Sequence, residues 1–323
     1  MENIKFYIGP MSKNIVDAII EFGTKEDKIG LIPSRRQVDY CGGYVNNWTT
    51  QQFSSYVKSQ NEAVWLQRDH GGPSQGQSMD DGTVSFLDDC KNFDSIHIDP
   101  WKKYTNFDEG MLKTVEFMKL LYSKNKNIKF EIGTEEAIRR FEVDEVEKLI
   151  VECQRLLPSN ICQNIDYIVI QSGVGLDLAT MNNTGDFNPE RLSKMIDVCK
   201  KHNLKTKEHN GDYLTNDQIK QRFELGLDSI NIAPEFGQLE TLCYFEEMKN
   251  TNQFEKLYQI CYNSNRWRKW VKSDFNPLTQ KEEIIKISGH YILSNPEFLQ
   301  IKPDIDTKIK SVITNKLREM YEI

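Results

Sequence analysis

The sequence predicts an α/β fold of the (β/α)8 barrel type with a helical extension at its C-terminal end. Short apolar runs rich in β-branched residues alternate with longer amphipathic stretches, and eight such units follow one another. The runs are apolar on both faces, as expected for parallel strands covered by helices. A doubly wound open sheet is the alternative, but that fold more usually has five or six strands.

Eight segments have the length and composition of buried strands. They are IKFYIGP from Ile4, KIGLIPS from Lys28, AVWLQRDH from Ala63, SIHIDP from Ser95, IKFEIGTEE from Ile128, IDYIVIQSG from Ile165, LKTKEHNG from Leu204 and SINIAPEFG from Ser229.

The intervening segments predict helices, because apolar residues recur at helical spacing. Examples are residues 108–123, 143–157, 188–202 and 215–227. We place the barrel in residues 1–238. Residues 239–323 read as a helical extension packed on it, since no Gly/Ser/Pro-rich linker separates the two. Within the extension, NRWRKWVK has two interpretations: a basic aromatic patch that stacks on a nucleobase, or a helix that packs its Trp side chains inward.

Composition excludes several classes of protein. The net charge of −7 argues against nucleic-acid binding, which needs clustered positive charge. The chain has no apolar run near the roughly 20 residues that span a bilayer, and its first residues lack a signal-peptide pattern. Its seven cysteines are scattered, without a CxxC pair, as in reduced cytoplasmic proteins. We expect a cytoplasmic protein without a membrane partner.

Polar residues gather where the predicted strands end, which is where barrels of this type place their active sites. Three of the five histidines lie there. The groups are Ser34-Arg35-Arg36-Gln37, Asp69-His70, His97 with Asp99, Glu131 with Glu135, Gln171-Ser172-Gly173, Glu208-His209-Asn210 with Asp212, and Asn231 with Glu235. Buried polar groups are costly unless they meet each other, a metal or a ligand. We therefore expect them to converge.

This residue set suits metal-assisted chemistry. Imidazoles and carboxylates around one axis can bind a divalent metal, and nitrogen with oxygen ligands favours zinc. We expect metal ligands among His70, His97, Glu131 and His209, and catalytic roles for Asp69 and Glu135. Such a metal would polarise a carbonyl and stabilise an enediolate while an Asp moves a proton. Substrate contacts are expected from Arg35, Arg36, Gln37, Arg68, Gln171, Ser172 and Asn231.

Each residue also has a structural interpretation. Asp69-His70 can cap the following loop, His97 can be a core histidine bonded to Asp99, and His209 can close a turn with Asp212. Arg35-Arg36 can be a solvated pair instead of a phosphate clamp. His202 and His290 are expected on the surface or in packing.

Six motifs in order at the strand ends resemble the tagatose-bisphosphate aldolase subunit often called non-catalytic, within the class II aldolase superfamily. They are RQVDYCGGYVNNWTTQQF (from Arg36), RDHGGP, IGTEE, IQSGVG, KEHNGDYLT and INIAPEFGQLETL. The resemblance implies a (β/α)8 barrel in ketose-bisphosphate metabolism, with zinc bound by histidines after three strands. It implies that Asp69 carries the proton, that His70 and His209 are ligands, and that Asn231 contacts the substrate. Glu135 matches the carboxylate after IGT.

Two departures from the family pattern matter. Active class II aldolases have a His-Gly where this chain has Val174-Gly175, so one ligand is missing unless His97, Glu131 or Glu135 replaces it. Gln67-Arg68 stands where that branch usually has glycines, and an added Arg suggests an anionic substrate.

Two functional hypotheses follow. One is an aldolase-like lyase, or a related isomerase or epimerase, that acts on a phosphorylated sugar. The other is a stabilising subunit that partners a catalytic aldolase, which the missing histidine favours. A homo-oligomer is compatible with both.

Overall fold

The computed structural model describes residues 4–24 and 27–323, and it confirms the (β/α)8 barrel. Eight parallel strands close in the order β1-β2-β3-β4-β5-β6-β9-β10, and β10 pairs with β1. That closure excludes the open sheet. The strands are β1 Phe6–Ile8, β2 Ile29–Leu31, β3 Trp65–Gly71, β4 Ser95–Ile98, β5 Lys129–Ile132, β6 Ile165–Ile170, β9 Lys205–Glu208 and β10 Ser229–Ile232.

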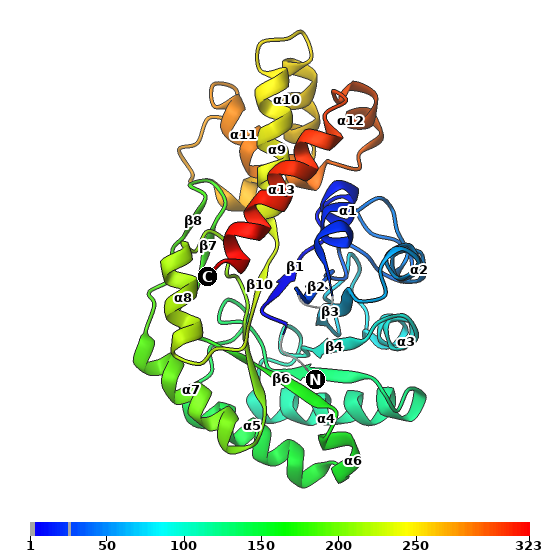
Figure 1. Ribbon diagram of the computed structural model, residues 1–323, viewed down its shortest axis with the longest axis vertical. Coiled ribbons are helices and arrows are strands. Elements are labelled where there is room, and N and C mark those ends of the chain that lie inside the picture. Colours follow the sequence, from blue (N-terminus) through cyan, green and yellow to red (C-terminus); the bar gives the residue numbers. More distant parts are fainter. Residues whose placement is uncertain (1–3, 25–26) are drawn as a thin grey trace.

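Helices follow the strands and cover the outside of the barrel (Figure 1). They are α1 Lys13–Phe22, α2 Thr50–Gln60, α3 Thr83–Asn92, α4 Phe107–Lys124, α5 Val143–Leu156, α6 Ser159–Cys162, α7 Pro189–Lys201, α8 Asn216–Glu224 and α9 Pro234–Met248. Several begin at the caps that the sequence provides. Thr49 and Thr215, for example, open capping boxes with Gln52 and Gln218. A short antiparallel pair, β7 Leu176–Asp177 and β8 Asn182–Asn183, interrupts the loop after β6.

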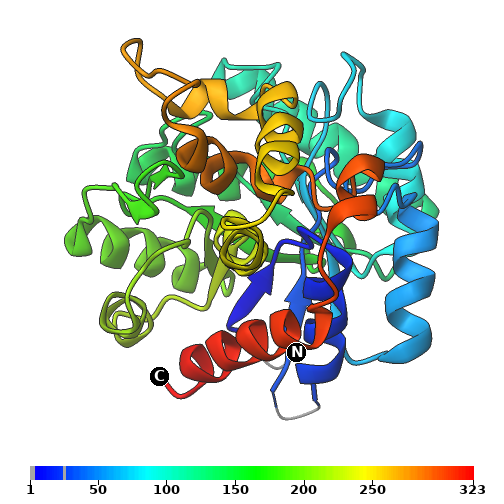
Figure 2. The ribbon, with the colours of Figure 1, turned by 90° about the horizontal axis from the view of Figure 1, so that it is seen from above.

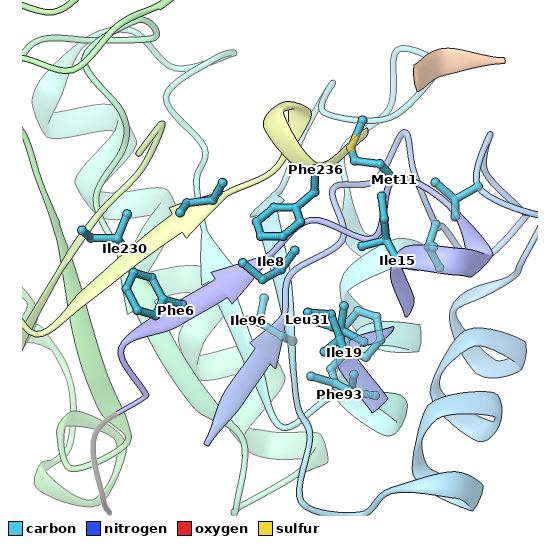
Figure 3. Packing of buried hydrophobic residues seen from close by; sticks show 14 of the residues in the cluster. Phe6, Ile8, Met11, Ile15, Ile19, Leu31, Phe93, Ile96, Ile230 and Phe236 are labelled. Atoms are coloured by element: carbon cyan, nitrogen blue, oxygen red, sulfur yellow. The ribbon is translucent and has the colours of Figure 1, made fainter. Parts of the chain in front are cut away.

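The main core lies between the strands and the helices. Ile8 of β1 lies beside Phe236 of α9 and on the side of Ile15 of α1 (Figure 3). The ring of Phe6 packs against Phe223 of α8, and both β1 side chains are fully buried. Side chains alternate along a strand, so these apolar residues come from every second position. The other positions face the barrel axis.

The interior of the barrel is polar at its centre. Nζ of Lys207 lies 2.6 Å from a carboxylate oxygen of Glu131 and donates a hydrogen bond of 2.7 Å to Gln67. Gln67 in turn donates to Glu131 over 2.6 Å. These residues come from β9, β5 and β3, which are not neighbours in the sheet, so the contacts cross the interior. The rings of Tyr7 and Tyr167 enclose the ammonium group of Lys207.

Arg68 faces the opposite side of β3 and is completely buried between the barrel and its helices. Its guanidinium group pairs with Asp89 of α3 at 2.6 Å and donates to the carbonyl oxygens of Pro33 and Val38. The expected substrate contact of Arg68 is therefore not supported. The side chain satisfies buried carbonyls behind the strand, since alternation directs it away from the axis.

The C-terminal segment is helical, as expected from its sequence. Its elements are α10 Phe254–Asn263, η1 Arg266–Trp270, α11 Lys281–Ser288, η2 Gly289–Tyr291, α12 Pro296–Ile301 and α13 Asp306–Tyr321. Helices α10 to α12 gather at one end of the barrel, and α13 runs back along α1 (Figures 1 and 2). The boundary at residue 238 stays a prediction. Within the described residues, no helix is both long and apolar enough to cross a membrane.

Asp212 connects the loop after β9 to the start of α9. Its Oδ1 atom accepts hydrogen bonds from the backbone N–H groups of Ala233 and Glu235 at 2.9 and 2.8 Å. Burial, and then the nearby carboxylate of Glu235, raises the pKa of Asp212 to about 8. The residue thus closes this part of the site, but its partner is the helix rather than His209.

We expect Asp89→Ala to lower the free energy of unfolding by about 3–5 kcal/mol, because it leaves the buried Arg68 charge without its partner. Denaturant unfolding would measure this loss. As a control, Glu116→Ala removes the exposed partner of Lys113 and should cost at most about 1 kcal/mol. Similar losses for the two variants would contradict the structural role of Arg68.

The raised pKa of Asp212 predicts a pH dependence. Its contribution to stability is fully present below the unfolded pKa of roughly 4. That contribution is lost as the pH rises through the folded value of about 8. Asp212→Asn keeps the acceptor oxygen without a titratable group, so it should gain stability relative to wild type between these two pH values. Unfolding curves across this range would test it, with the exposed Asp217→Asn as control, and parallel profiles would refute it.

Candidate metal and substrate site

Three histidines from three strands meet at the C-terminal end of the barrel. The ring centroids of His70 and His97 are 5.0 Å apart, those of His70 and His209 also 5.0 Å, and those of His97 and His209 4.9 Å. These residues end β3, β4 and β9 respectively. The convergence expected from the strand ends is therefore present.

His70 reaches this cluster through an unusual backbone conformation. Regular alternation would direct it outward with Arg68, but its φ is +42° and the pairing of β3 with β4 shifts register between Arg68 and Gly71. Such a bulge redirects one side chain, and positive φ is costly for a residue with a Cβ atom. The strained turn places the imidazole over the barrel axis, beside Asp69.

Each imidazole has one nitrogen held by an acceptor. Nδ1 of His70 lies 2.6 Å from Asp99, Nε2 of His209 lies 2.6 Å from Glu131, and Nε2 of His97 lies 3.0 Å from the carbonyl oxygen of Gly133. With a proton on each of these nitrogens, the second nitrogen of each ring would be the one to bind a metal ion. Ligating histidines are usually oriented in this way by carboxylates and carbonyls. The second nitrogens are Nε2 of His70, Nδ1 of His97 and Nδ1 of His209. Nε2 of His70 and Nδ1 of His209 lie 3.3 Å apart, and the backbone N–H of His70 donates to Nδ1 of His97 over 3.3 Å.

Asp69 joins the three imidazoles. One ligand atom from each of the four residues lies within 4.8 Å of the others. Oδ1 of Asp69 is 3.5 Å from Nδ1 of His209 and 3.7 Å from Nε2 of His70. No described residue donates a hydrogen bond to this buried oxygen. A buried carboxylate oxygen without a hydrogen-bond donor is uncommon, and a bound cation is one partner that would satisfy it.

Glu135 forms a second carboxylate beside the cluster. Its Oε2 atom accepts a hydrogen bond of 2.5 Å from Asn210 and lies 3.6 Å from Nε2 of His70. Burial alone would raise the pKa of Glu135, but the charge of His70 and these contacts lower it to about 2. Glu135 is therefore ionised at neutral pH.

The carboxylates give the site a negative potential. Burial would lower the pKa of His70, but Asp69, Glu135 and Asp99 outweigh this effect and raise it well above the ordinary value. Burial lowers the pKa of His97, which stays neutral. A site that holds a proton this strongly also attracts other cations.

A cavity of about 450 Å³ opens above the cluster, and we call it the metal-side cavity. Asp69, His70, Glu135 and Gln37 line it, together with Val174 from the loop after β6. The C-terminal extension closes it with Lys269, Trp270, His290 and Tyr291. A cavity of about 510 Å³ lies on the other side of the Val174 loop, but neither Asp69 nor any histidine lines it.

Two other predicted residues lie near the cluster in different settings. Glu131 is buried beneath it, where it already accepts hydrogen bonds from Lys207, Gln67 and His209. This geometry favours a role in holding His209 over the expected role of metal ligand. Asn231 is buried at the end of β10, and among the described residues neither atom of its side-chain amide has a partner. The role of Asn231 in substrate contact stays a prediction.

The two adjacent arginines separate. Arg35 is buried and pairs with Asp39 at 2.9 Å and Asp80 at 2.5 Å, while it also donates to the carbonyl oxygen of Gly72. Its donors anchor the loops after β2 and β3, so the expected substrate contact is not supported. Arg36 is exposed and lines a cavity described below.

Gln171 and Ser172 also serve the fold. The amide of Gln171 accepts from the backbone of Phe141 and donates to the carbonyl oxygens of Thr134 and Arg139. The hydroxyl of Ser172 donates to Glu208, which pairs with Arg222 of α8. Their hydrogen bonds are used in fixing the loops, and the geometry supports a substrate contact for neither residue.

Three residues at the site were missed as site residues. Asp99 orients the ring of His70. Its position two residues after His97 indicated that both side chains face the barrel axis, which was the signal that could have identified it. Lys207 has the same relation to His209 and balances Glu131. His290 was expected on the surface or in packing, but it is buried against the cavity, and neither ring nitrogen has a partner among the described residues. No sequence signal connects this residue to the barrel.

No protein-family model matches the chain, and no curated protein sequence matches it. Solved structures share its fold. A probable tagatose 6 phosphate kinase from Sinorhizobium meliloti is 12% identical, with a TM-score of 0.76 over 99% of this chain and 100% of that one. The YdjI aldolase from Escherichia coli K12 is 13% identical, with a TM-score of 0.56 over 98% and 91%. The fructuronate-tagaturonate epimerase UxaE from Cohnella laeviribosi is 11% identical, with a TM-score of 0.63 over 99% and 81%. At these identities the likeness establishes the barrel fold.

Proposed function

We propose that this chain is a metal-dependent enzyme of the class II aldolase type that acts on a phosphorylated ketose. The observation that carries the proposal is the group of three imidazole nitrogens beside the unpaired oxygen of Asp69. Proteins of similar fold include the YdjI aldolase and a fructuronate-tagaturonate epimerase. These two activities support chemistry of the aldolase or epimerase type for this chain.

The donor set fits a divalent ion such as zinc. Catalytic zinc sites commonly have three protein ligands and one open position. His70, His97 and His209 would hold the ion, each with its other nitrogen already fixed. When bound, such an ion supplies Lewis acidity that polarises a carbonyl group. His97 then replaces the histidine that is absent at Val174.

Asp69 is the residue best placed to carry a proton. Its Oδ1 atom faces the cluster without a donor, so it can accept a proton from a carbon or hydroxyl of the substrate and return it. Glu135, ionised on the cavity wall, and the free amide of Asn231 would hold substrate hydroxyl groups.

Epimerisation is the second candidate. Asp69 and Glu135 both lie near His70, and two carboxylates can remove a proton on one face and return it on the other. Product analysis with a phosphorylated ketose separates the candidates, because a lyase releases two shorter fragments and an epimerase does not. A stabilising subunit would bind no metal and would not convert the phosphorylated ketose into either kind of product. Cytoplasmic location, self-association and an aldolase partner stay predictions.

Purified protein loaded with zinc should contain about one ion per chain, and His209→Ala should lose it because one of three ligands is gone. Metal analysis after dialysis would measure the content. His202→Ala is the control, since that ring contacts Gln154 away from the cluster. Equal zinc content in His209→Ala and wild type would remove the metal site from the proposal.

Asp69→Asn should retain the metal but lower kcat about 10²- to 10⁴-fold, the usual contribution of a positioned acid or base. Turnover and zinc content would be measured on the same sample. Asp197→Asn, exposed on α7, controls for the loss of one carboxylate. If Asp69→Asn instead loses zinc, Asp69 is a ligand and another group carries the proton.

A further inference from the structure

A second cavity, of about 370 Å³, is lined by four positively charged side chains, and we call it the cationic cavity. They are Arg36 from the loop after β2 and Arg266, Arg268 and Lys269 from η1. Ser34, Tyr44, Asn265 and Tyr291 complete its wall, to which the described part of the chain contributes no carboxylate. Residues far apart in the sequence therefore contribute like charges to one cavity.

The packing of η1 explains why these cations face outward together. Trp267 is buried, and its ring stacks on Tyr262 with centroids 5.7 Å apart. Its indole N–H also donates to the carbonyl oxygen of Tyr262. This anchor fixes a short 3-10 turn whose basic side chains, Arg266, Arg268 and Lys269, are exposed, while Trp270 packs against the core. The NRWRKW segment thus packs its first Trp inward and presents its basic residues to the cavity.

Among residues 4–24 and 27–323, no carboxylate forms an ion pair within 4.0 Å of these four cations, and none lines the cationic cavity. Glu135 acts on the charge of Lys269 from the metal-side cavity, which both residues line. Other arginines in the chain pair readily, as Arg139 does with Glu145 at 2.6 Å. Desolvation and the charges of Arg36 and Arg266 lower the pKa of Lys269. An anion bound among these cations would relieve the repulsion between them.

The cationic cavity adjoins the metal-side cavity. Ser34, Tyr44, Lys269 and Tyr291 line both of them. A ligand with one end at Asp69 and His70 can therefore extend past the two tyrosines to the cations. Residues at the strand ends would hold one end of such a ligand, and Arg36 with the cations of η1 would hold the other.

We propose that the cationic cavity binds the terminal phosphate of a ligand whose other end lies at the histidine cluster. This inference deepens the proposed function and rests on it for the identity of that other end. Guanidinium groups bind phosphate oxygens through paired hydrogen bonds, and a dianion balances more of the four charges than a carboxylate does. The extension thereby supplies a specificity-determining surface that the barrel lacks.

The test is isothermal titration calorimetry with fructose 6-phosphate, fructose, fructuronate and inorganic phosphate, on protein with and without zinc. Fructose 6-phosphate should bind more tightly than fructose, and its affinity should fall as salt is added. Arg266→Gln and Lys269→Gln should each weaken it about tenfold or more, since each removes a charge-assisted hydrogen bond. The exposed Arg318→Gln, outside this cavity, should leave it unchanged.

Unchanged affinity in both Arg266→Gln and Lys269→Gln would overturn the proposal. Fructuronate that binds as tightly as fructose 6-phosphate through the same residues would overturn the choice of phosphate. Inorganic phosphate should still bind to His209→Ala, because this cavity does not depend on the metal ligands. Loss of zinc and loss of phosphate binding therefore report separately on the proposed function and on this inference.

Discussion

The buried ion pair of Lys207 and Glu131 is the interaction on which the site depends. A charge inside the barrel is costly unless it is paired and hydrogen bonded, and here both conditions are met by Gln67 and by the flanking tyrosine rings. The other oxygen of Glu131 holds His209 at 2.6 Å. Burial would raise the pKa of Glu131, but Lys207 and the imidazoles hold it well below its usual range. Glu131 therefore balances the charge of Lys207 and also holds the imidazole ring of His209.

Strand alternation predicted much of this arrangement. Glu131, His97 and Asp69 face the axis because each lies at an inward position of its strand, and polar strand ends converge in a closed barrel. Alternation alone fails at His70, since it predicts an outward ring. The bulge and the positive φ that redirect this residue depend on the loop after β3 and on its contacts, which are not local properties of the sequence.

Four of the expected substrate contacts, Arg35, Arg68, Gln171 and Ser172, instead hold the fold together, for a related reason. A polar residue at a strand end meets either a ligand or the loops that surround the ligand, and its type does not distinguish the two. Arg35, Gln171 and Ser172 fill their hydrogen bonds with loop carbonyls, carboxylates and backbone N–H groups. Asn231 and Asp69 do not, and only the structure separates these cases. The contribution of the C-terminal extension to the site could not be predicted from the sequence either, because His290 and Lys269 lie far along the chain from the strands they cover.

The two adjoining cavities differ in charge. Carboxylates of Asp69 and Glu135 line the metal-side cavity together with Lys269, whereas the guanidinium groups of Arg36, Arg266 and Arg268 line only the cationic cavity. Tyr44 and Tyr291, with ring centroids 5.7 Å apart, stand on the shared wall between the carboxylates and the guanidinium groups. These rings are uncharged, and they line both cavities. A ligand that is anionic at one end and offers a carbonyl at the other is then oriented by charge alone, because the reverse orientation would place its anion beside the carboxylates.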